Sequence, residues 1–168
     1  MSASARSAVT LSVLGVLVVV AALWGWAAAT QPLPGKVDTP VCVTRAVSAG
    51  EKVYPQDVTV SVYNAGTRDG LAGRVKQQLS DIGFSKGTDA NAPSDAKVST
   101  VQIWTTQPTS PAVLLVASWL GKSVDIERRE GIGPGVTVVV GDKFTQVSGG
   151  RRGVVAKADA FICSPPVG

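Results

Sequence analysis

The longest uncharged stretch of the chain sets the first limit on its fold. Residues 8–29, AVTLSVLGVLVVVAALWGWAAA, carry no charged side chain. At 1.5 Å per residue they form a helix of about 33 Å, enough to cross a hydrocarbon core of about 30 Å. Trp24 and Trp26 suit an interfacial aromatic belt, and Arg6 before the segment favours a cytoplasmic N-terminus. The segment predicts a single-pass membrane anchor, with residues 1–7 cytoplasmic and the folded part outside the cytoplasm.

A cleaved signal peptide is the main alternative interpretation of this segment, and a buried helix of a cytosolic protein is the least favoured. Residues 27–29 are all alanine and fit the small-x-small cleavage pattern, although the apolar core of a signal peptide usually has only about 7–15 residues. The anchor and the signal peptide both place the fold in an oxidising compartment. The chain has two cysteines, and this even number predicts a disulfide between Cys42 and Cys163. Two free buried thiols are the alternative.

Composition removes several classes of function. The 168 residues include no histidine, which excludes a Ser-His-Asp triad, a Cys-His pair and a histidine metal site. Two cysteines cannot form a four-cysteine zinc site or hold an iron–sulfur cluster alone. The net charge of +4 comes without a long basic stripe, so no nucleic-acid partner is expected. We predict no metal, no cofactor and no enzyme activity.

Hydrophobic periodicity predicts a mixed α/β domain. The predicted strands are residues 58–63, a short strand from Phe84, 98–104, 124–127 and 136–140, and the predicted helices are residues 70–82 and 112–120. Their order, β-α-β-β-α-β-β, matches a two-layer, split βαβ-like sandwich with its helices on one face of the sheet. Val58, Val60 and Val62 alternate as in a strand with one buried side. The small and polar residues 87–95 predict a loop.

Helix ends are predicted from capping residues. Asp69 is placed to cap the first helix, and Gly83 is a natural left-handed stop. Ser110 followed by Pro111 favours the start of the second helix, which Gly121 ends.

The rest of the chain divides around this domain. A strand at residues 41–48 and another at 154–163 are expected to pair as an appendage held by the disulfide. The predicted segments are a Pro-rich stalk at residues 30–40, an N-terminal flank with Cys42 at 41–57, the domain at 58–144 and a C-terminal flank with Cys163 at 145–168.

The most pointed candidate site is the loop NAGTRDG between the first strand and the first helix. Asn64, Gly66, Arg68 and Gly70 form a candidate ligand-binding loop, because glycines before a helix can expose amides to an anion and an arginine would assist. The loop lacks the Gly-Lys-Ser/Thr of a P-loop. A turn whose glycines only satisfy backbone geometry is the simpler interpretation.

Two basic turns are further candidates. Arg151 and Arg152 form a candidate basic surface, and Arg128 with Arg129 forms a second. Outside the cytoplasm such groups meet anionic lipids, anionic wall polymers or a partner protein. Ordinary solvated surface is the alternative.

Two other features are better explained by structure than by chemistry. Trp104 and Trp119 suit either a sugar-stacking platform or the core, and their apolar surroundings favour the core. Ser94 and Lys97 match the Ser-x-x-Lys of serine acyltransferases, but no companion motif accompanies them, which favours a solvated loop.

The run VSVYNAGTRDGLA at residues 60–72, followed by Gly83 and Phe84, resembles the opening of the LytR C-terminal domain family. The apolar helix ending Trp-Leu-Gly and the strand VTVVVGD at residues 136–142 resemble that domain's close. The resemblance covers about residues 58–144. In that family the domain often follows a LytR-CpsA-Psr phosphotransferase domain, which attaches anionic polymers to peptidoglycan, and we expect no such domain in this chain.

A single anchor, one such domain and flanking cysteines resemble the actinobacterial cell-envelope integrity proteins. The resemblance implies a non-enzymatic role in maintaining the envelope, by binding an anionic cell-wall polymer or a wall-assembly protein. A protein-interaction scaffold for wall-synthesis or polymer-ligating enzymes is the alternative. An enzyme acting on glycans or lipid-linked phosphates is less favoured.

Overall fold

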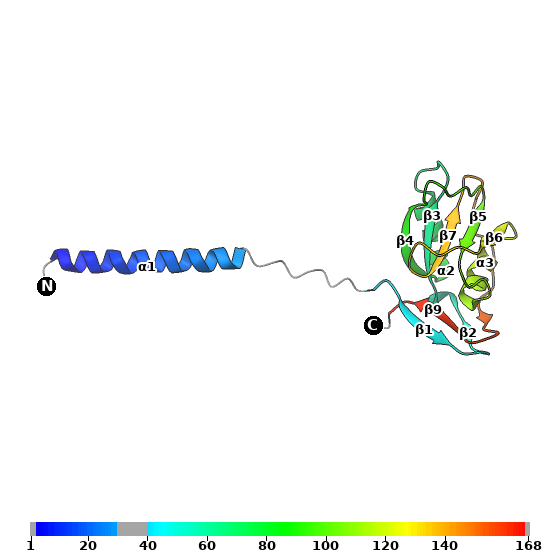
Figure 1. Ribbon diagram of the computed structural model, residues 1–168, viewed down its shortest axis with the longest axis horizontal. Coiled ribbons are helices and arrows are strands. Elements are labelled where there is room, and N and C mark those ends of the chain that lie inside the picture. The colour runs from blue at the N-terminus through cyan, green and yellow to red at the C-terminus, as the bar shows by residue number, and fades with distance from the viewer. Residues whose placement is uncertain (1–2, 30–39, 167–168) are drawn as a thin grey trace. The chain divides into compact units, whose positions relative to one another are not determined.

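The computed structural model describes residues 3–29 and 40–166, which belong to two compact units. The first unit holds helix α1 (Ala3–Ala29) (Figure 1). A search of the described residues finds no helix that meets the length and hydropathy of a membrane span. The predicted anchor therefore stays a prediction. The predicted stalk lies outside the described residues except for Pro40.

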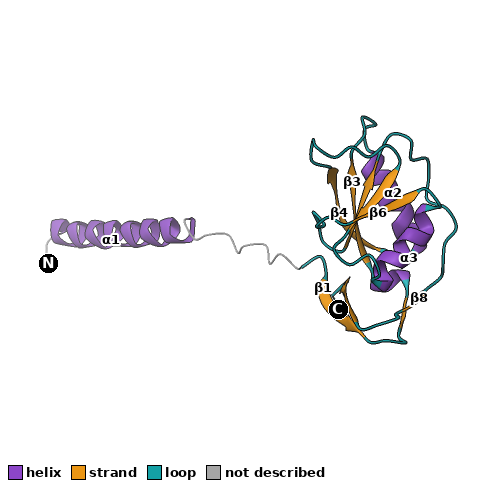
Figure 2. Cartoon of the chain, turned by 45° about the vertical axis from the view of Figure 1, so that its right-hand side comes forward, coloured by secondary structure: helices purple, strands orange, loops and turns teal. Residues whose placement is uncertain are grey.

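The second unit is built on a mixed five-stranded sheet with the order β4-β3-β7-β5-β6. Its strands are β3 (Thr59–Asn64), β4 (Ser85–Asn91), β5 (Val101–Trp104), β6 (Val124–Glu127) and β7 (Val136–Val140). Helices α2 (Leu71–Ile82) and α3 (Pro111–Leu120) pack against one face of this sheet (Figure 2). The mixed α/β class, the order of elements and the placement of both helices on one face are confirmed.

The split βαβ arrangement is wrong. In a split unit another strand separates the two parallel strands, whereas β3 pairs directly with β4 and β5 pairs directly with β6, both in parallel. Strand β7 lies between these two strand pairs, parallel to β3 and antiparallel to β5. The order of elements along the chain is the same in both arrangements, so sequence periodicity could not distinguish them.

The sheet is covered on both faces. Toward the helices, Val60, Val62 and Ile103 are almost fully buried with the apolar side of α2 and α3. On the opposite face Tyr63 and Trp104 form a second buried cluster with Val98 and Val139. The prediction that the first strand has only one buried side is therefore wrong, because loops cover the second face.

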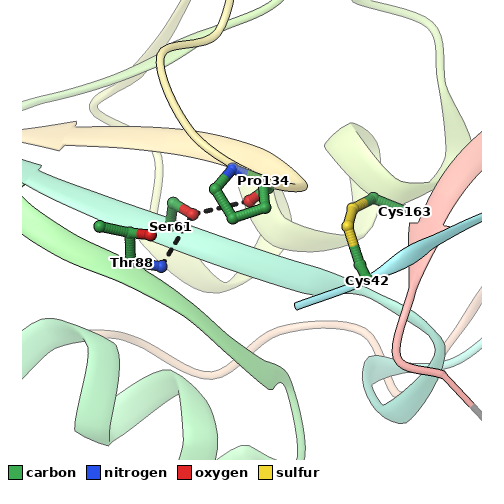
Figure 3. Close-up of a disulfide and its surroundings, with 5 residues drawn as sticks. All are labelled: Cys42, Ser61, Thr88, Pro134 and Cys163. Carbon is green, nitrogen blue, oxygen red and sulfur yellow. Dashed lines mark hydrogen bonds between the residues drawn. A yellow bond between two sulfur atoms is a disulfide. The ribbon is translucent and has the colours of Figure 1, made fainter. Parts of the chain in front are cut away.

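The loop at residues 128–135 closes that second face through hydrogen bonds. The Tyr63 hydroxyl donates to the Ile132 carbonyl at 3.0 Å, and the Ser61 hydroxyl donates to the Pro134 carbonyl at 2.6 Å (Figure 3). Gly133 permits this contact, since a Cβ there would lie 2.3 Å from the Tyr63 hydroxyl.

The predicted loop at residues 87–95 is wrong over its first half. Strand β4 runs through it to Asn91, although glycine and aspartate are poor strand formers. Pairing with β3 stabilises β4, and its register shifts between Val60 and Val62. At this bulge the amide of Thr88 donates to the Ser61 hydroxyl at 3.1 Å. Gly87 lies so close to β3 that a Cβ would be 2.8 Å from the Val60 carbonyl oxygen.

Both ends of helix α2 are formed by glycine backbone conformations and not by a capping side chain. The N-cap of α2 is Gly70, in the left-handed region with φ 67°, and no side chain of the described residues caps it. The prediction that Asp69 caps this helix is therefore wrong. Gly83 ends α2 in the left-handed region, as predicted, and its amide donates to the carbonyls of Leu79 and Ser80. Ser110 is the N-cap residue of α3 by position.

The two flanks come together as predicted. Antiparallel pairs join β1 (Val43–Val47) to β9 (Ala160–Ser164), and β2 (Lys52–Val53) to β8 (Val154–Val155), with the single-turn helix η1 (Pro55–Asp57) following β2. The Cys42–Cys163 disulfide is confirmed and joins positions 121 residues apart (Figure 3). Val47, Val53, Val154 and Ile162 are buried in the main core, so the flanks belong to the folded unit.

Candidate functional site

The loop at residues 64–70 leaves the carboxyl end of β3 and is held by its own first residue. The Asn64 side chain accepts a hydrogen bond from the Gly66 amide and donates one to the Arg68 carbonyl, both at 2.9 Å. Such side-chain-to-backbone bonds are typical of asparagine in turns. Asn64 thus fixes the conformation of the loop. The Thr67 and Arg68 amides remain available for hydrogen bonds to other parts of the protein.

Asp142, directly after β7, takes those remaining amides. Its carboxylate accepts hydrogen bonds from the Thr67 amide at 2.8 Å and the Arg68 amide at 3.1 Å, and from the Thr67 hydroxyl at 3.2 Å. The Thr67 amide bond is the largest cause that lowers the pKa of Asp142. Gly66 makes room for this contact, because a Cβ there would lie 2.2 Å from the carboxylate. The protein's own carboxylate therefore occupies the position predicted for an external anion.

Arg68 is also engaged within the protein. Its guanidinium donates to the carbonyl oxygen of Asp142 at 3.2 Å and to that of Phe144 at 2.9 Å. These bonds tie the loop to the segment after β7. The structure thus brings Asn64, Gly66 and Arg68 together around Asp142, while Gly70 starts α2. Their role in ligand binding stays a prediction.

A polar crevice lies beside this loop, at the carboxyl ends of β3 and β4. It has a volume of about 270 Å³. Asn64 faces Asn91 across the two strands, and both line it. The other lining residues are Ala65, Gly66, Thr67, Asp69, Ala92, Pro93, Ser94 and Ala96. Crevices at the carboxyl ends of parallel strands are frequent ligand sites in α/β proteins. We call this feature the β3–β4 crevice.

Sequence reasoning missed part of this crevice. Asn91 is not a predicted site residue, because the segment around it is predicted to be a loop, and Ser94 is considered only as the candidate nucleophile of the Ser-x-x-Lys pair. Asp142 was missed because only the pairing of β3 with β7 brings it to residues 67 and 68.

The predicted basic residues serve separate contacts. Arg151 and Arg152 are exposed, and the Arg151 backbone accepts a hydrogen bond from the Trp119 indole at 3.0 Å. Arg129 lies over the ring of Trp104, 4.1 Å from its centre, and pairs with Asp95 at 3.0 Å. Trp104 is 2% exposed and belongs to the core.

The remaining candidates show no catalytic arrangement. Ser94 and Lys97 are exposed and do not lie on a helix, which the Ser-x-x-Lys geometry of acyltransferases requires. Within residues 3–29 and 40–166, no three cysteine or carboxylate side chains are grouped so as to hold a metal ion.

Comparison with known proteins gives two matches. The family model described as LytR cell envelope-related transcriptional attenuator (LytR_C) matches residues 57–144. A crystal structure of the soluble domain of a conserved hypothetical secreted protein from Mycobacterium marinum is 24% identical, with a TM-score of 0.49 over 61% of this chain and 78% of that chain. No curated protein matches the chain. Because the family model covers more than half of the 168 residues, the chain belongs to the LytR_C family.

Proposed function

We propose that this protein is a non-enzymatic, membrane-anchored module of the cell envelope that binds the glycan part of a cell-wall polymer in the β3–β4 crevice. Membership of the LytR_C family fits a cell-envelope role. The disulfide supports an extracytoplasmic location for the folded unit, since such bonds persist in oxidising compartments. The anchor proposed at residues 8–29 would hold the module at the membrane surface, where even a weak contact with the wall is effective.

The chemistry of the β3–β4 crevice carries the proposal. Amide, hydroxyl and backbone groups dominate its lining, and Asp69 is its one charged residue. Arg68 points its guanidinium at carbonyl oxygens of residues 142 and 144. Neutral donors and acceptors suit sugar hydroxyls better than phosphate groups, which prefer arginine and lysine. The glycan of a wall polymer is therefore the ligand we assign to this crevice.

Retention on purified cell wall tests the proposal. In the double substitution Asn91→Ala, Ser94→Ala, two hydrogen bonds of about 1 kcal/mol each are lost, which predicts about 5- to 30-fold weaker retention. Lys122→Ala, at an exposed residue beyond the end of α3, is the matched control and should bind normally. Retention that survives the double substitution, or that disappears in about 0.5 M salt where charge contacts are screened, would contradict glycan binding in this crevice.

A protein partner is the second candidate function, and one observation favours it. On the flanks, Phe161 is 64% exposed and Val155 is 53% exposed. Large apolar side chains exposed to water favour a contact with another protein. A scaffold predicts a specific cross-linked protein in intact membranes that is lost on Phe161→Ser. It also predicts no retention on purified wall, so the two functions give opposite results in the same pair of assays.

A further inference from the structure

The two flanks form one continuous ribbon of two antiparallel arms. The same offset relates the partners in the β1–β9 and β2–β8 pairs, from Val43 opposite Ser164 to Val53 opposite Val154. Between the two pairs Ala156 continues the ladder, because its amide donates to a backbone carbonyl of the other arm at 2.8 Å. We call residues 43–53 and 154–164 the flank ribbon.

Side chains alternate between two different faces of this ribbon, as they do along any strand. The inner face packs into the core through the buried residues Val47, Val53, Val154, Ala156 and Ile162. The outer face carries the exposed side chains of Val155 and Phe161, with Lys157 between them at the same spacing. Lys52, which lies opposite Val155, is exposed on this face as well. The outer face therefore combines exposed apolar side chains with lysines.

The free charges of the outer face are positive. Lys157 forms no ion pair with any described residue, and the Lys52 ammonium lies over the exposed Tyr54 ring, 5.3 Å from its centre. Asp159 lies on this face too, but its carboxylate accepts a hydrogen bond from the Ala49 amide at 2.8 Å. Lysines attract anionic lipid headgroups, while exposed aromatic and aliphatic side chains suit the boundary between headgroups and acyl chains.

The flank ribbon is also the end of the folded unit from which the chain continues toward α1. Cys42 directly precedes β1, and ten residues, 30–39, lie between Ala29 at the end of α1 and Pro40. Ten residues reach at most about 36 Å even when fully extended. An anchor at residues 8–29 would therefore keep the ribbon within that distance of the membrane.

The β3–β4 crevice belongs to the other end of the folded unit. Val58, directly before β3, lines a cavity together with Phe161 and Cys163 of the ribbon. Asn64, at the opposite end of β3, lines the crevice. Figure 1 shows β1, β2 and β9 together at one end of the unit, below the sheet. A ribbon that faces the membrane therefore leaves the crevice directed away from it.

We infer that the outer face of the flank ribbon docks on the anionic phospholipid headgroups of the membrane that holds the anchor. Phe161 and Val155 enter the interface, and the two lysines contact headgroup phosphates. The inference rests on the anchored module proposed above and adds an orientation to it. The position where the chain enters the ribbon and the positive charge of its outer face both support lipid as the occupant.

Lipid nanodiscs that hold the ¹⁵N-labelled full chain test the docking. Discs of phosphatidylcholine alone are compared with discs of equal parts phosphatidylcholine and phosphatidylglycerol, each with a spin label on a lipid headgroup. In the anionic discs we expect the label to broaden the amide signals of Val155, Lys157 and Phe161. The Asn91 signal in the crevice should stay sharp.

The same discs separate failure of the docking from failure of the anchor. Coelution of the chain with phosphatidylcholine discs reports the anchor by itself. A chain that coelutes but shows no broadening of the ribbon in anionic discs, or equal broadening at Asn91, would overturn the docking alone. A chain that coelutes with neither kind of disc would overturn the anchor and the docking with it.

Substitutions place the contact on the named side chains. Lys157→Gln should lower the ratio of docked to undocked protein about 5-fold, whereas Lys122→Gln, a matched change of an exposed lysine beyond the far end of α3, should not change it. Phe161→Ser should lower it about 5- to 10-fold without loss of the fold, because this side chain is exposed. Equal effects of the two lysine substitutions would contradict the docking. A protein cross-linked to the ribbon in intact membranes, without broadening in protein-free anionic discs, would assign the face to a protein partner and also overturn it.

Discussion

At the scale of single residues, Asp142 decides the shape of the 64–70 loop. Its carboxylate accepts hydrogen bonds from two consecutive backbone amides, those of Thr67 and Arg68. An anion bound by main-chain donors is the arrangement that sequence reasoning expected from a ligand. The amides of this loop therefore bind a carboxylate of the chain itself, and binding of an external ligand stays a prediction.

Asp142→Asn should make the protein less stable in a pH-dependent way. Because hydrogen bonds lower the pKa of Asp142 in the folded state, its contribution to stability is present above the ordinary carboxyl pKa of about 4. That contribution is lost as pH falls through the folded-state pKa. Urea unfolding should show a lower midpoint for the variant at pH 7 and converging midpoints near pH 3.

Glu130→Gln is the control for this prediction, since Glu130 is exposed and forms no ion pair among the described residues. It should leave the midpoint unchanged across the same pH range. A difference between Asp142→Asn and the unsubstituted chain that persists undiminished at pH 3 would show that the carboxylate charge is not the cause.

At the scale of elements, the sequence predicted those with strong internal patterns. Helix α2 was predictable because Leu71, Val75 and Leu79 repeat at helical spacing and all three are buried. Strand β7 was predictable because all five of its residues are β-branched, and all are buried. Strand β4 was not predictable, because its composition, SKGTDAN, has no apolar alternation. It forms because β3 offers it hydrogen bonds and because Gly87 fits against the Val60 carbonyl.

Two hydroxyls on the same face of β3 should have opposite effects on stability. Ser61 is fully buried, donates to the Pro134 carbonyl and accepts from the Thr88 amide, so it holds both β4 and the covering loop. Ser61→Ala leaves these two groups unpaired and should cost about 1–3 kcal/mol. Thr59 is also fully buried, but its hydroxyl has no partner among the described residues. Thr59→Val removes that unpaired group and should be neutral or stabilising by about 1 kcal/mol.

Chemical denaturation with hydrogen exchange measures both effects. Faster exchange of the Thr88 amide is expected in Ser61→Ala and not in Thr59→Val, since only the first substitution removes its acceptor. Equal destabilisation of both variants would contradict the assigned role of the Ser61 hydrogen bonds, because Thr59→Val keeps the side-chain volume and removes a hydroxyl that has no partner among the described residues.

At the scale of the whole molecule, the disulfide encloses nearly all of the folded unit. Cys42 directly precedes β1, and Cys163 lies within β9. The two cysteines are 121 positions apart in the sequence. This disulfide was predictable from the sequence, because an exported chain with two cysteines is expected to form one. The neighbours of each strand were not predictable, because hydrophobic periodicity identifies the strands but not which strands pair in the sheet.

Removing the disulfide should weaken the whole folded unit. In the chain-entropy model a loop of this length contributes about 5 kcal/mol, and measured losses are typically about 2–5 kcal/mol. The double substitution Cys42→Ser, Cys163→Ser should lower the free energy of unfolding by that amount, measured in urea. Dithiothreitol should reproduce this loss of stability in the unsubstituted chain and change nothing in the double variant. Equal stability with and without reductant would mean that the core, through Val47 and Ile162, holds the flanks without the covalent bond.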